Sequence, residues 1–197
     1  MAKTLVETIA INRLNQKRGD ILLIIRSTKN LLKDMKIDKS ITKIDIADPF
    51  FSWHANLVFV NKRKHIVLIN DLSRLSLTIA GIRSTQYKNL KNIFKEQLEN
   101  YLISERINKS TIHEYLNECN EAVYTTTNNR SILGTLNDIV LIMQDVGTEF
   151  DNYYDLNRWN NDRLYKSIDL NNQREYLRPI ELFNNELENR YTRLFDS

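Results

Sequence analysis

The sequence has few of the features that mark export, disulfide bonding or insertion into a membrane. Its 197 residues include a single cysteine, Cys119, which excludes an intrachain disulfide and a structural zinc site built from several cysteines. No continuous apolar run approaches the roughly 18 residues needed to span a bilayer. Residues 1–20 lack the continuous apolar core and the small-residue cleavage site of a signal peptide. We therefore expect a soluble protein in a reducing compartment, with the cytoplasm as the default.

Common catalytic and cofactor motifs are also missing. The chain has four glycines, and neither the GxxxxGK[ST] phosphate loop nor the GxSxG nucleophile turn occurs. The three histidines, His54, His65 and His113, show neither HxH nor HxxxH spacing, so we expect no metal site. No cysteine–histidine pairing and no pair of acids at a recognisable spacing appears. The sequence therefore leaves any cofactor unknown.

Basic residues exceed acidic residues only slightly, by 28 to 25, an excess too small to indicate nucleic-acid binding by itself. Their distribution is uneven. Residues 51–88 contain six lysines and arginines but one acid, Asp71, whereas residues 150–197 contain nine acids and seven bases. We therefore expect positive potential on the turns of the first region and a nearly neutral C-terminal segment.

Residues 50–79 form the stretch around which we expect the fold to be organised. Apolar side chains alternate with others through 53–59, a continuous apolar run covers 65–69, and alternation returns at 75–79. Alternation is typical of a strand with one buried face, and a continuous run is typical of a strand buried on both faces. The sequence therefore predicts three antiparallel strands in succession.

Two further strands and several helices complete the predicted fold. The added strands are 21–25 and 121–127, and apolar periodicity predicts helices at 29–36, 86–105, 111–120, 131–146 and after Pro179. We therefore predict an α+β fold, a mainly antiparallel sheet of about five strands covered by three or four helices.

The predicted division of the chain has three parts. An N-terminal extension covers 1–20, the α+β core domain covers 21–147, and a polar C-terminal extension with a terminal helix covers 148–197. Within the last part, residues 150–172 are expected to be irregular, with one helical turn near 156–165, because apolar anchors are sparse there.

The most suggestive polar motif is Thr126–Asp138, which spans a predicted strand end and helix start. Unpaired N–H groups at a helix start, the Ser131 hydroxyl and the forked Arg130 cation together suit a phosphate or a carboxylate. Asn129 directly precedes them. We therefore take Asn129, Arg130 and Ser131 as candidate ligand-binding residues.

Gly134, Asn137 and Asp138 continue this motif along the helix. They share a helix face with Arg130, and Gly134 would let a ligand or another backbone come close. The structural alternative is that the motif holds a plain helix cap, a glycine that contacts the sheet and a buried amide that pairs with strand backbone.

Two other stretches carry candidate residues. In Trp53-His54-Ala55-Asn56, His54 could act as a general base, and Asn56, opposite the apolar face, needs a hydrogen-bond partner if it is covered. The alternative is that His54 faces the solvent or has its hydrogen bonds satisfied by the protein. The turn Lys62-Arg63-Lys64 suits a nucleic-acid backbone, and its alternative is a solvated turn that discourages strand aggregation.

These motifs resemble a bacterial family that is known only as a domain of unknown function. The matching residues are Trp53-x-Ala55-Asn56-Leu57, Asn129-Arg130-Ser131-x-Leu133-Gly134-Thr135-Leu136-Asn137-Asp138 and Ser27-Thr28-Lys29-Asn30-Leu31-Leu32. The chain departs from the family pattern at His54 for tyrosine, Ser52 for aspartate and Leu136 for methionine. The resemblance covers about 21–146 and implies that the two polar motifs form one shared site.

Three classes of function remain open. The first is a binding module for a phosphate-bearing ligand, with RNA or DNA favoured, contacted by Arg130, Ser131 and the turn 62–64. The second is a phosphodiester-cleaving or nucleotide-modifying enzyme with His54 as base and Arg130 stabilising developing charge. The third is a protein-interaction module or homodimer that uses the aromatic residues of 150–197.

The two polar motifs meet in space if strand 121–127 pairs next to strand 53–59. The helix that starts at Ser131 would then begin near the end of that strand, since a buried strand needs neighbours for its backbone groups. We expect Asn56 and Asn137 to face one polar pocket in that case, with Arg130 at its rim.

Overall fold

The structure is a computed structural model that describes residues 22–38, 44, 47–146, 152–168 and 174–192. The extension predicted at 1–20, and the first residue of the strand predicted at 21–25, lie outside the described residues. In the described part of the chain, no helix is both long and apolar enough to cross a membrane.

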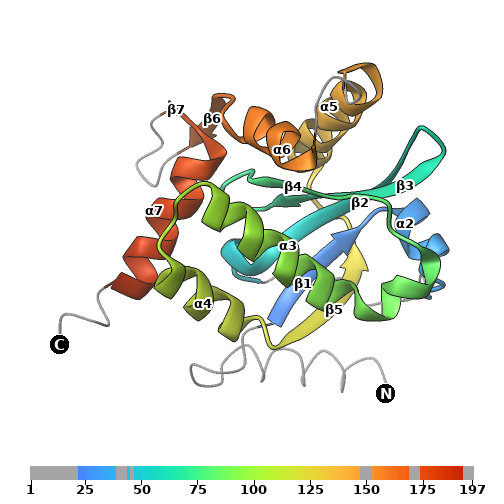
Figure 1. The fold of residues 1–197 in the computed structure, drawn as a ribbon, viewed down its shortest axis with the longest axis horizontal. Helices are drawn as coiled ribbons and strands as arrows, with labels where there is room; N and C mark the ends of the chain where they lie inside the picture. Colours follow the sequence, from blue (N-terminus) through green and yellow to red (C-terminus); the bar gives the residue numbers. More distant parts are fainter. Residues whose placement is uncertain (1–21, 39–43, 45–46, 147–151, 169–173, 193–197) are drawn as a thin grey trace.

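A five-stranded mixed sheet forms the centre of the protein (Figure 1). In the order in which they lie side by side, its strands are β4 (Ser76–Ile79), β3 (Arg63–Asn70), β2 (Ser52–Val60), β1 (Leu22–Ser27) and β5 (Glu121–Thr126). β2, β3 and β4 form the predicted antiparallel succession. β1, however, pairs parallel with both β2 and β5.

The α+β class is confirmed, but the prediction of a mainly antiparallel sheet is wrong. Helix α2 (Lys29–Asp34) lies between β1 and β2, and longer helices lie between β4 and β5. Such crossover connections return the chain in the same direction, which gives parallel pairing. The two polar motifs were expected to meet only if 121–127 paired next to 53–59, and this condition is not met, because β1 lies between β5 and β2.

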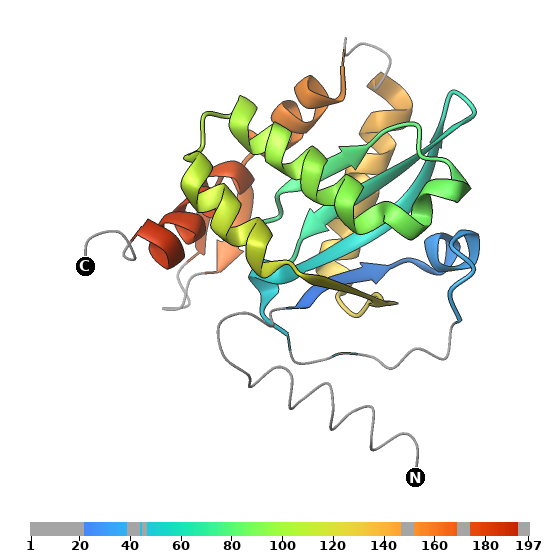
Figure 2. The same cartoon turned by 60° about the horizontal axis from the view of Figure 1, so that its bottom comes forward.

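Helices cover both faces of the sheet (Figures 1 and 2). One face packs against α3 (Leu90–Ser104), α4 (Lys109–Glu118) and α7 (Pro179–Tyr191). The other packs against α5 (Arg130–Val146) and α6 (Tyr153–Asn161). The 3-10 turns η1 (Pro49–Phe51) and η2 (Ser84–Asn89) and a hairpin of β6 (Tyr165–Ile168) and β7 (Arg174–Leu177) complete the described elements.

The long predicted helices are confirmed, while the C-terminal part differs from its prediction. The helix predicted at 86–105 begins as the 3-10 turn η2 before it becomes α3. The segment 150–172 was predicted to be irregular with one helical turn. Where it is described, it contains the nine-residue helix α6 and strand β6 instead.

Alternation along β2 sends its side chains to two different cores. The Trp53 ring packs edge-on against Phe94 of α3, with ring centroids 5.0 Å apart. Val58 packs among the apolar residues of α5. Because successive side chains of a strand point to opposite faces, His54 and Asn56 face the same side as Val58. The strand therefore places two polar side chains beneath α5.

Asparagine side chains of α6 close the open edge of β4. Asn161 Oδ1 accepts a hydrogen bond from the Ser76 N–H at 2.7 Å, and Asn161 Nδ2 donates to the Ser76 carbonyl oxygen at 2.8 Å. Asn157 Oδ1 accepts from the Thr78 N–H at 3.0 Å. These bonds occupy edge groups that would otherwise be open to pairing with another chain. An amide-rich helix face thus substitutes for a further strand.

Replacing Asn161 with leucine should destabilise the protein by about 2–4 kcal/mol, because the buried N–H and carbonyl groups of Ser76 each lose a partner. Asn92→Leu is the matched control, since Asn92 is an exposed asparagine on α3 and surface substitutions stay within about 0.5 kcal/mol. Urea melts of both variants measure the two free energies of unfolding. Equal values for the two variants would contradict the edge-closing role of Asn161.

Candidate functional site

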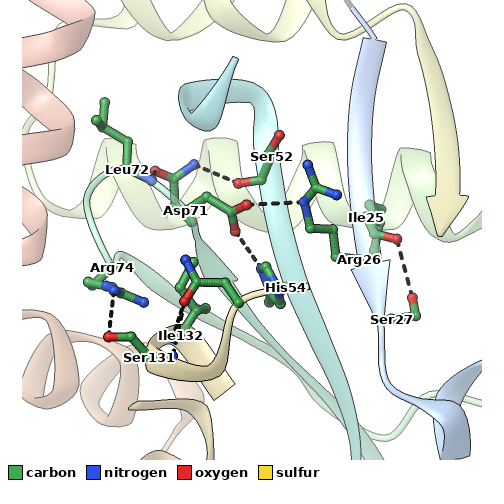
Figure 3. Close-up of polar contacts among 12 residues, drawn as sticks. Ile25, Arg26, Ser27, Ser52, His54, Asp71, Leu72, Arg74, Ser131 and Ile132 are labelled. Carbon is green, nitrogen blue, oxygen red and sulfur yellow. Dashed lines mark hydrogen bonds and ion pairs between the residues drawn. The ribbon is translucent and has the colours of Figure 1, made fainter. Parts of the chain in front are cut away.

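The start of α5 lies beside the end of β3. Asn129 caps the helix, since its Oδ1 accepts hydrogen bonds from the N–H groups of Ser131 at 3.0 Å and Ile132 at 3.3 Å. The Arg130 and Ser131 side chains are exposed. Ser131 Oγ accepts a hydrogen bond at 3.2 Å from Arg74, which follows β3 (Figure 3). The predicted helix start thus lies next to an arginine from a distant part of the sequence.

Arg74 is a half-buried cation that forms no ion pair with any residue the structure describes. Its backbone lies in the left-handed region, with φ at 66°, and its Nη1 is buried without a hydrogen-bond partner in the described chain. Burial lowers the pKa of Arg74, while Asp71 and Tyr165 nearby act in the opposite direction. Because a desolvated cation is unfavourable unless it is paired, Arg74 presents a donor that still needs an acceptor.

Arg163 and Tyr165 reach the same neighbourhood from the end of α6 and the start of β6. The guanidinium carbon of Arg163 lies 5.3 Å from the ring centroid of Trp159 and 5.7 Å from that of Tyr165. Burial is the main cause of the raised pKa of Tyr165. Arg163 and Arg74 lower that pKa and Asp138 raises it. The Tyr165 phenol therefore lies within the fields of two arginines and one aspartate.

Arg74, Ser131, Arg163 and Tyr165 are named here the arginine–tyrosine cluster. Arg74 Nη1, Arg163 Nη1 and the Tyr165 hydroxyl are all buried, and no described residue gives any of them a hydrogen-bond partner. Buried polar groups nearly always have partners. Three donors of this kind in one neighbourhood therefore point to an acceptor that the described chain does not supply.

A buried polar network adjoins this cluster. Asp71, directly after β3, has its Oδ1 2.6 Å from His54 Nδ1, and its Oδ2 accepts from Arg26 Nε at 3.3 Å (Figure 3). Arg26 Nη1 also donates to the Ile44 carbonyl oxygen at 2.6 Å. The side chains of His54 and Arg26 are 0% and 4% exposed, and that of Asp71 is 12% exposed. The network therefore ties β1, β2 and β3 together at one end of the sheet.

His54 has the orientation of a general base without the access that a base needs. In the neutral ring, Asp71 selects the tautomer with the proton on Nδ1, which leaves the lone pair on Nε2. Nε2 is buried, and no described residue is its hydrogen-bond partner. A general base must lie within hydrogen-bond reach of its substrate, so a catalytic role for His54 remains a prediction.

The predicted basic turn lies at the other end of β2. Lys62 and Arg63 are exposed at the tip of the β2–β3 hairpin, whereas Lys64 pairs with Asp34 through a 2.7 Å contact between Nζ and Oδ2. At about 3.3 Å per residue, the length of β2 separates this tip from the start of the strand by about 25 Å. The structure therefore does not bring the turn and the start of α5 together.

The remaining predicted residues also lie apart. Asn56 Oδ1 accepts a hydrogen bond from the Thr28 hydroxyl at 2.8 Å. Asn137 is exposed, and the pairing of β5 beside β2 that would have joined it to Asn56 does not occur. Gly134 and Asp138 are exposed too, and a Cβ atom on Gly134 would meet nothing within 4 Å. Packing therefore does not require a glycine at position 134.

Sequence reasoning missed Asp71, Arg74, Arg163 and Tyr165 as site residues. One signal was available for the first two, because they follow directly after a continuous apolar strand, where functional loops often begin. Arg163 and Tyr165 gave no such signal, since they lie in a polar segment with few apolar anchors.

A family model described as "Domain of unknown function (DUF6933)" matches residues 24–182. The match confirms the resemblance noted in the sequence. It runs from β1 into α7, so it includes both the arginine–tyrosine cluster and the Arg26–Asp71–His54 network. No curated protein and no solved structure matches the chain.

Replacing Asp71 with asparagine should destabilise the protein by about 3–5 kcal/mol, because it leaves a buried guanidinium without its carboxylate. Glu99→Gln is the matched control: Glu99 Oε1 lies 2.9 Å from His113 Nε2 in an exposed pair, and such pairs contribute about 0–1 kcal/mol. Denaturant melts at pH 7 compare the two variants. A loss for Asp71→Asn no larger than that for Glu99→Gln would show that the network is not structural.

Proposed function

We propose that this chain, which belongs to the family described as "Domain of unknown function (DUF6933)", is a binding module for a phosphate-bearing ligand. The observation that carries the proposal is the arginine–tyrosine cluster. There Arg74 Nη1, Arg163 Nη1 and the Tyr165 hydroxyl are buried, and the described chain offers them no acceptor. A phosphate group presents several acceptor oxygens and negative charge to such a set of donors.

The charges around the cluster favour an anion over a neutral ligand. Three arginines, Arg26, Arg74 and Arg163, lie in or next to the cluster, against two aspartates, Asp71 and Asp138. Asp71 is already engaged by Arg26, so Arg74 keeps a donor for another acceptor. Guanidinium groups match the geometry of phosphate oxygens, and a partly buried setting strengthens each contact relative to water.

RNA or DNA is the ligand class that we favour. Arg130 is exposed at the start of α5, next to the cluster, and Lys62 and Arg63 form a second exposed basic region. The two regions are about 25 Å apart by strand length. A single phosphate cannot contact both, whereas a polynucleotide backbone can, with release of its counterions.

The Arg26–Asp71–His54 network supports a second candidate, a phosphodiester-cleaving enzyme. Asp71 orients the His54 ring so that Nε2 carries the lone pair of a base. Arg74, close to Asp71, would then stabilise developing negative charge. The His54 side chain is fully buried, whereas Arg74, Arg163 and Tyr165 are each partly exposed. The geometry therefore favours binding over cleavage.

Exchanging Arg74 and Arg163 together for glutamine should weaken RNA binding by about a hundredfold or more, since each change removes a charge-assisted hydrogen bond worth about 1.5–3 kcal/mol. The measurement is the fluorescence anisotropy of a labelled single-stranded RNA of about 12 nucleotides, titrated with the full chain. Wild-type affinity should also fall steeply between about 50 and about 200 mM KCl, as counterion release requires.

The control variant, Lys62→Ala with Arg63→Ala, removes the same number of positive charges from the hairpin tip. A larger loss in this variant than in the Arg74 and Arg163 variant would contradict the cluster as the main site. If wild-type protein binds no RNA but is stabilised by inorganic phosphate, the phosphate site stands and the nucleic-acid class is rejected. If the wild type cleaves the RNA and the His54→Ala variant does not, the second candidate, the phosphodiester-cleaving enzyme, is favoured.

A further inference from the structure

We propose a second binding site, chemically distinct from the first, in a cavity beside β4. The cavity has a volume of about 620 Å³ and is lined by residues of β4, the segment after it, η2, α3 and the start of α6. Figure 1 shows β4 between these two helices. Asn157 covers the edge at Thr78, and the cavity extends from there past Ile79. Its volume suits a small organic ligand, for which sites of about 300–1,000 Å³ are usual.

Apart from Glu96, the described lining of this cavity combines apolar walls with uncharged polar side chains. Ile82, Ile93 and Leu156 supply apolar surface, and Gln97 and Asn152 supply amide groups. Among the described lining residues there is no lysine, arginine or histidine. The cavity therefore lacks the groups that would bind a phosphate or a carboxylate.

Thr78 lines the cavity, and it carries a buried hydroxyl that has no partner among the described residues. Its side chain is buried, with 3% of the residue exposed, and its Oγ1 has no hydrogen-bond partner among the described residues. The Thr78 N–H is already bonded to Asn157 Oδ1 at 3.0 Å, which holds the backbone in place. A buried hydroxyl without a partner is unfavourable. A ligand in the cavity that carries a donor or an acceptor would satisfy it.

Glu96 and two tyrosines determine the class of ligand. Glu96 lines the cavity and is exposed, so its carboxylate lies toward the solvent side. Tyr153 and Tyr154 line the cavity as well, and aromatic faces attract cations. The Tyr153 ring also packs against His65, with ring centroids 5.1 Å apart. These groups select a small molecule with a flat apolar body and a cationic hydrogen-bond donor, such as an amidine or guanidine group. This polarity is opposite to that of the arginine–tyrosine cluster, so the two sites are independent.

The test uses two probes of similar shape and opposite charge, benzamidine and benzoate, with the full chain and ligand-observed NMR. Benzamidine should bind about tenfold more tightly than benzoate, because the cation can pair with the Glu96 carboxylate and the anion is repelled by it. Glu96→Gln should weaken benzamidine binding by about fivefold or more. Thr78→Val, which keeps the shape and removes the hydroxyl, should weaken it by about threefold.

Glu99→Gln is the matched control, because Glu99 lies on the same helix and does not line the cavity. It should bind benzamidine as the wild type does. The proposal is overturned if benzamidine does not bind, if benzoate binds as tightly, or if Glu96→Gln and Thr78→Val bind like the control. Displacement of benzamidine by inorganic phosphate would also overturn it. Because Glu96 is exposed, the Glu96→Gln variant should fold, and it keeps the test decisive even if Thr78→Val fails to fold.

Discussion

The carboxylate of Asp71 is the contact on which one end of the sheet depends. Its backbone N–H donates to the Ser52 carbonyl oxygen at 2.9 Å, and its two side-chain oxygens engage His54 of β2 and Arg26 of β1. All of these side chains are buried or nearly so, and removing one member of such a group leaves the others buried without a partner. The chain turns directly after Asp71 and places Arg74 next to the start of α5. The polar network thus fixes both the strand ends and the position of the arginine–tyrosine cluster.

Much of the fold could be predicted from the sequence, because apolar periodicity indicates which residues are buried. Alternation at 53–59 and a continuous apolar run at 65–69 predict β2 and β3, and the 3.6-residue pattern at 131–146 predicts α5. Periodicity does not say which strands are neighbours, so the parallel pairing of β1 with β2 and β5 was missed. α6 was underestimated for a different reason. Its buried face includes asparagines that bond the edge of β4, and asparagine is typical of loops.

The site was only partly predictable. Arg130 and Ser131 mark a helix start, which a sequence pattern can locate, and that start does lie beside unpaired donors. The donors themselves come from Arg74, Arg163 and Tyr165, which tertiary folding brings together. α6 also contributes to the site, since its end leads to Arg163. Its asparagines therefore matter for the site, because they fix the helix against β4.

The central claim is that the arginine–tyrosine cluster binds a phosphate-like anion. The most direct measurement is a crystal structure of the full chain with tungstate, a dianion that is similar to phosphate and has a strong anomalous signal. We expect tungstate within hydrogen-bond distance of Arg74 Nη1, Arg163 Nη1 and the Tyr165 hydroxyl. Only ordered water at these donors under saturating tungstate, or both arginines paired with carboxylates, would contradict it.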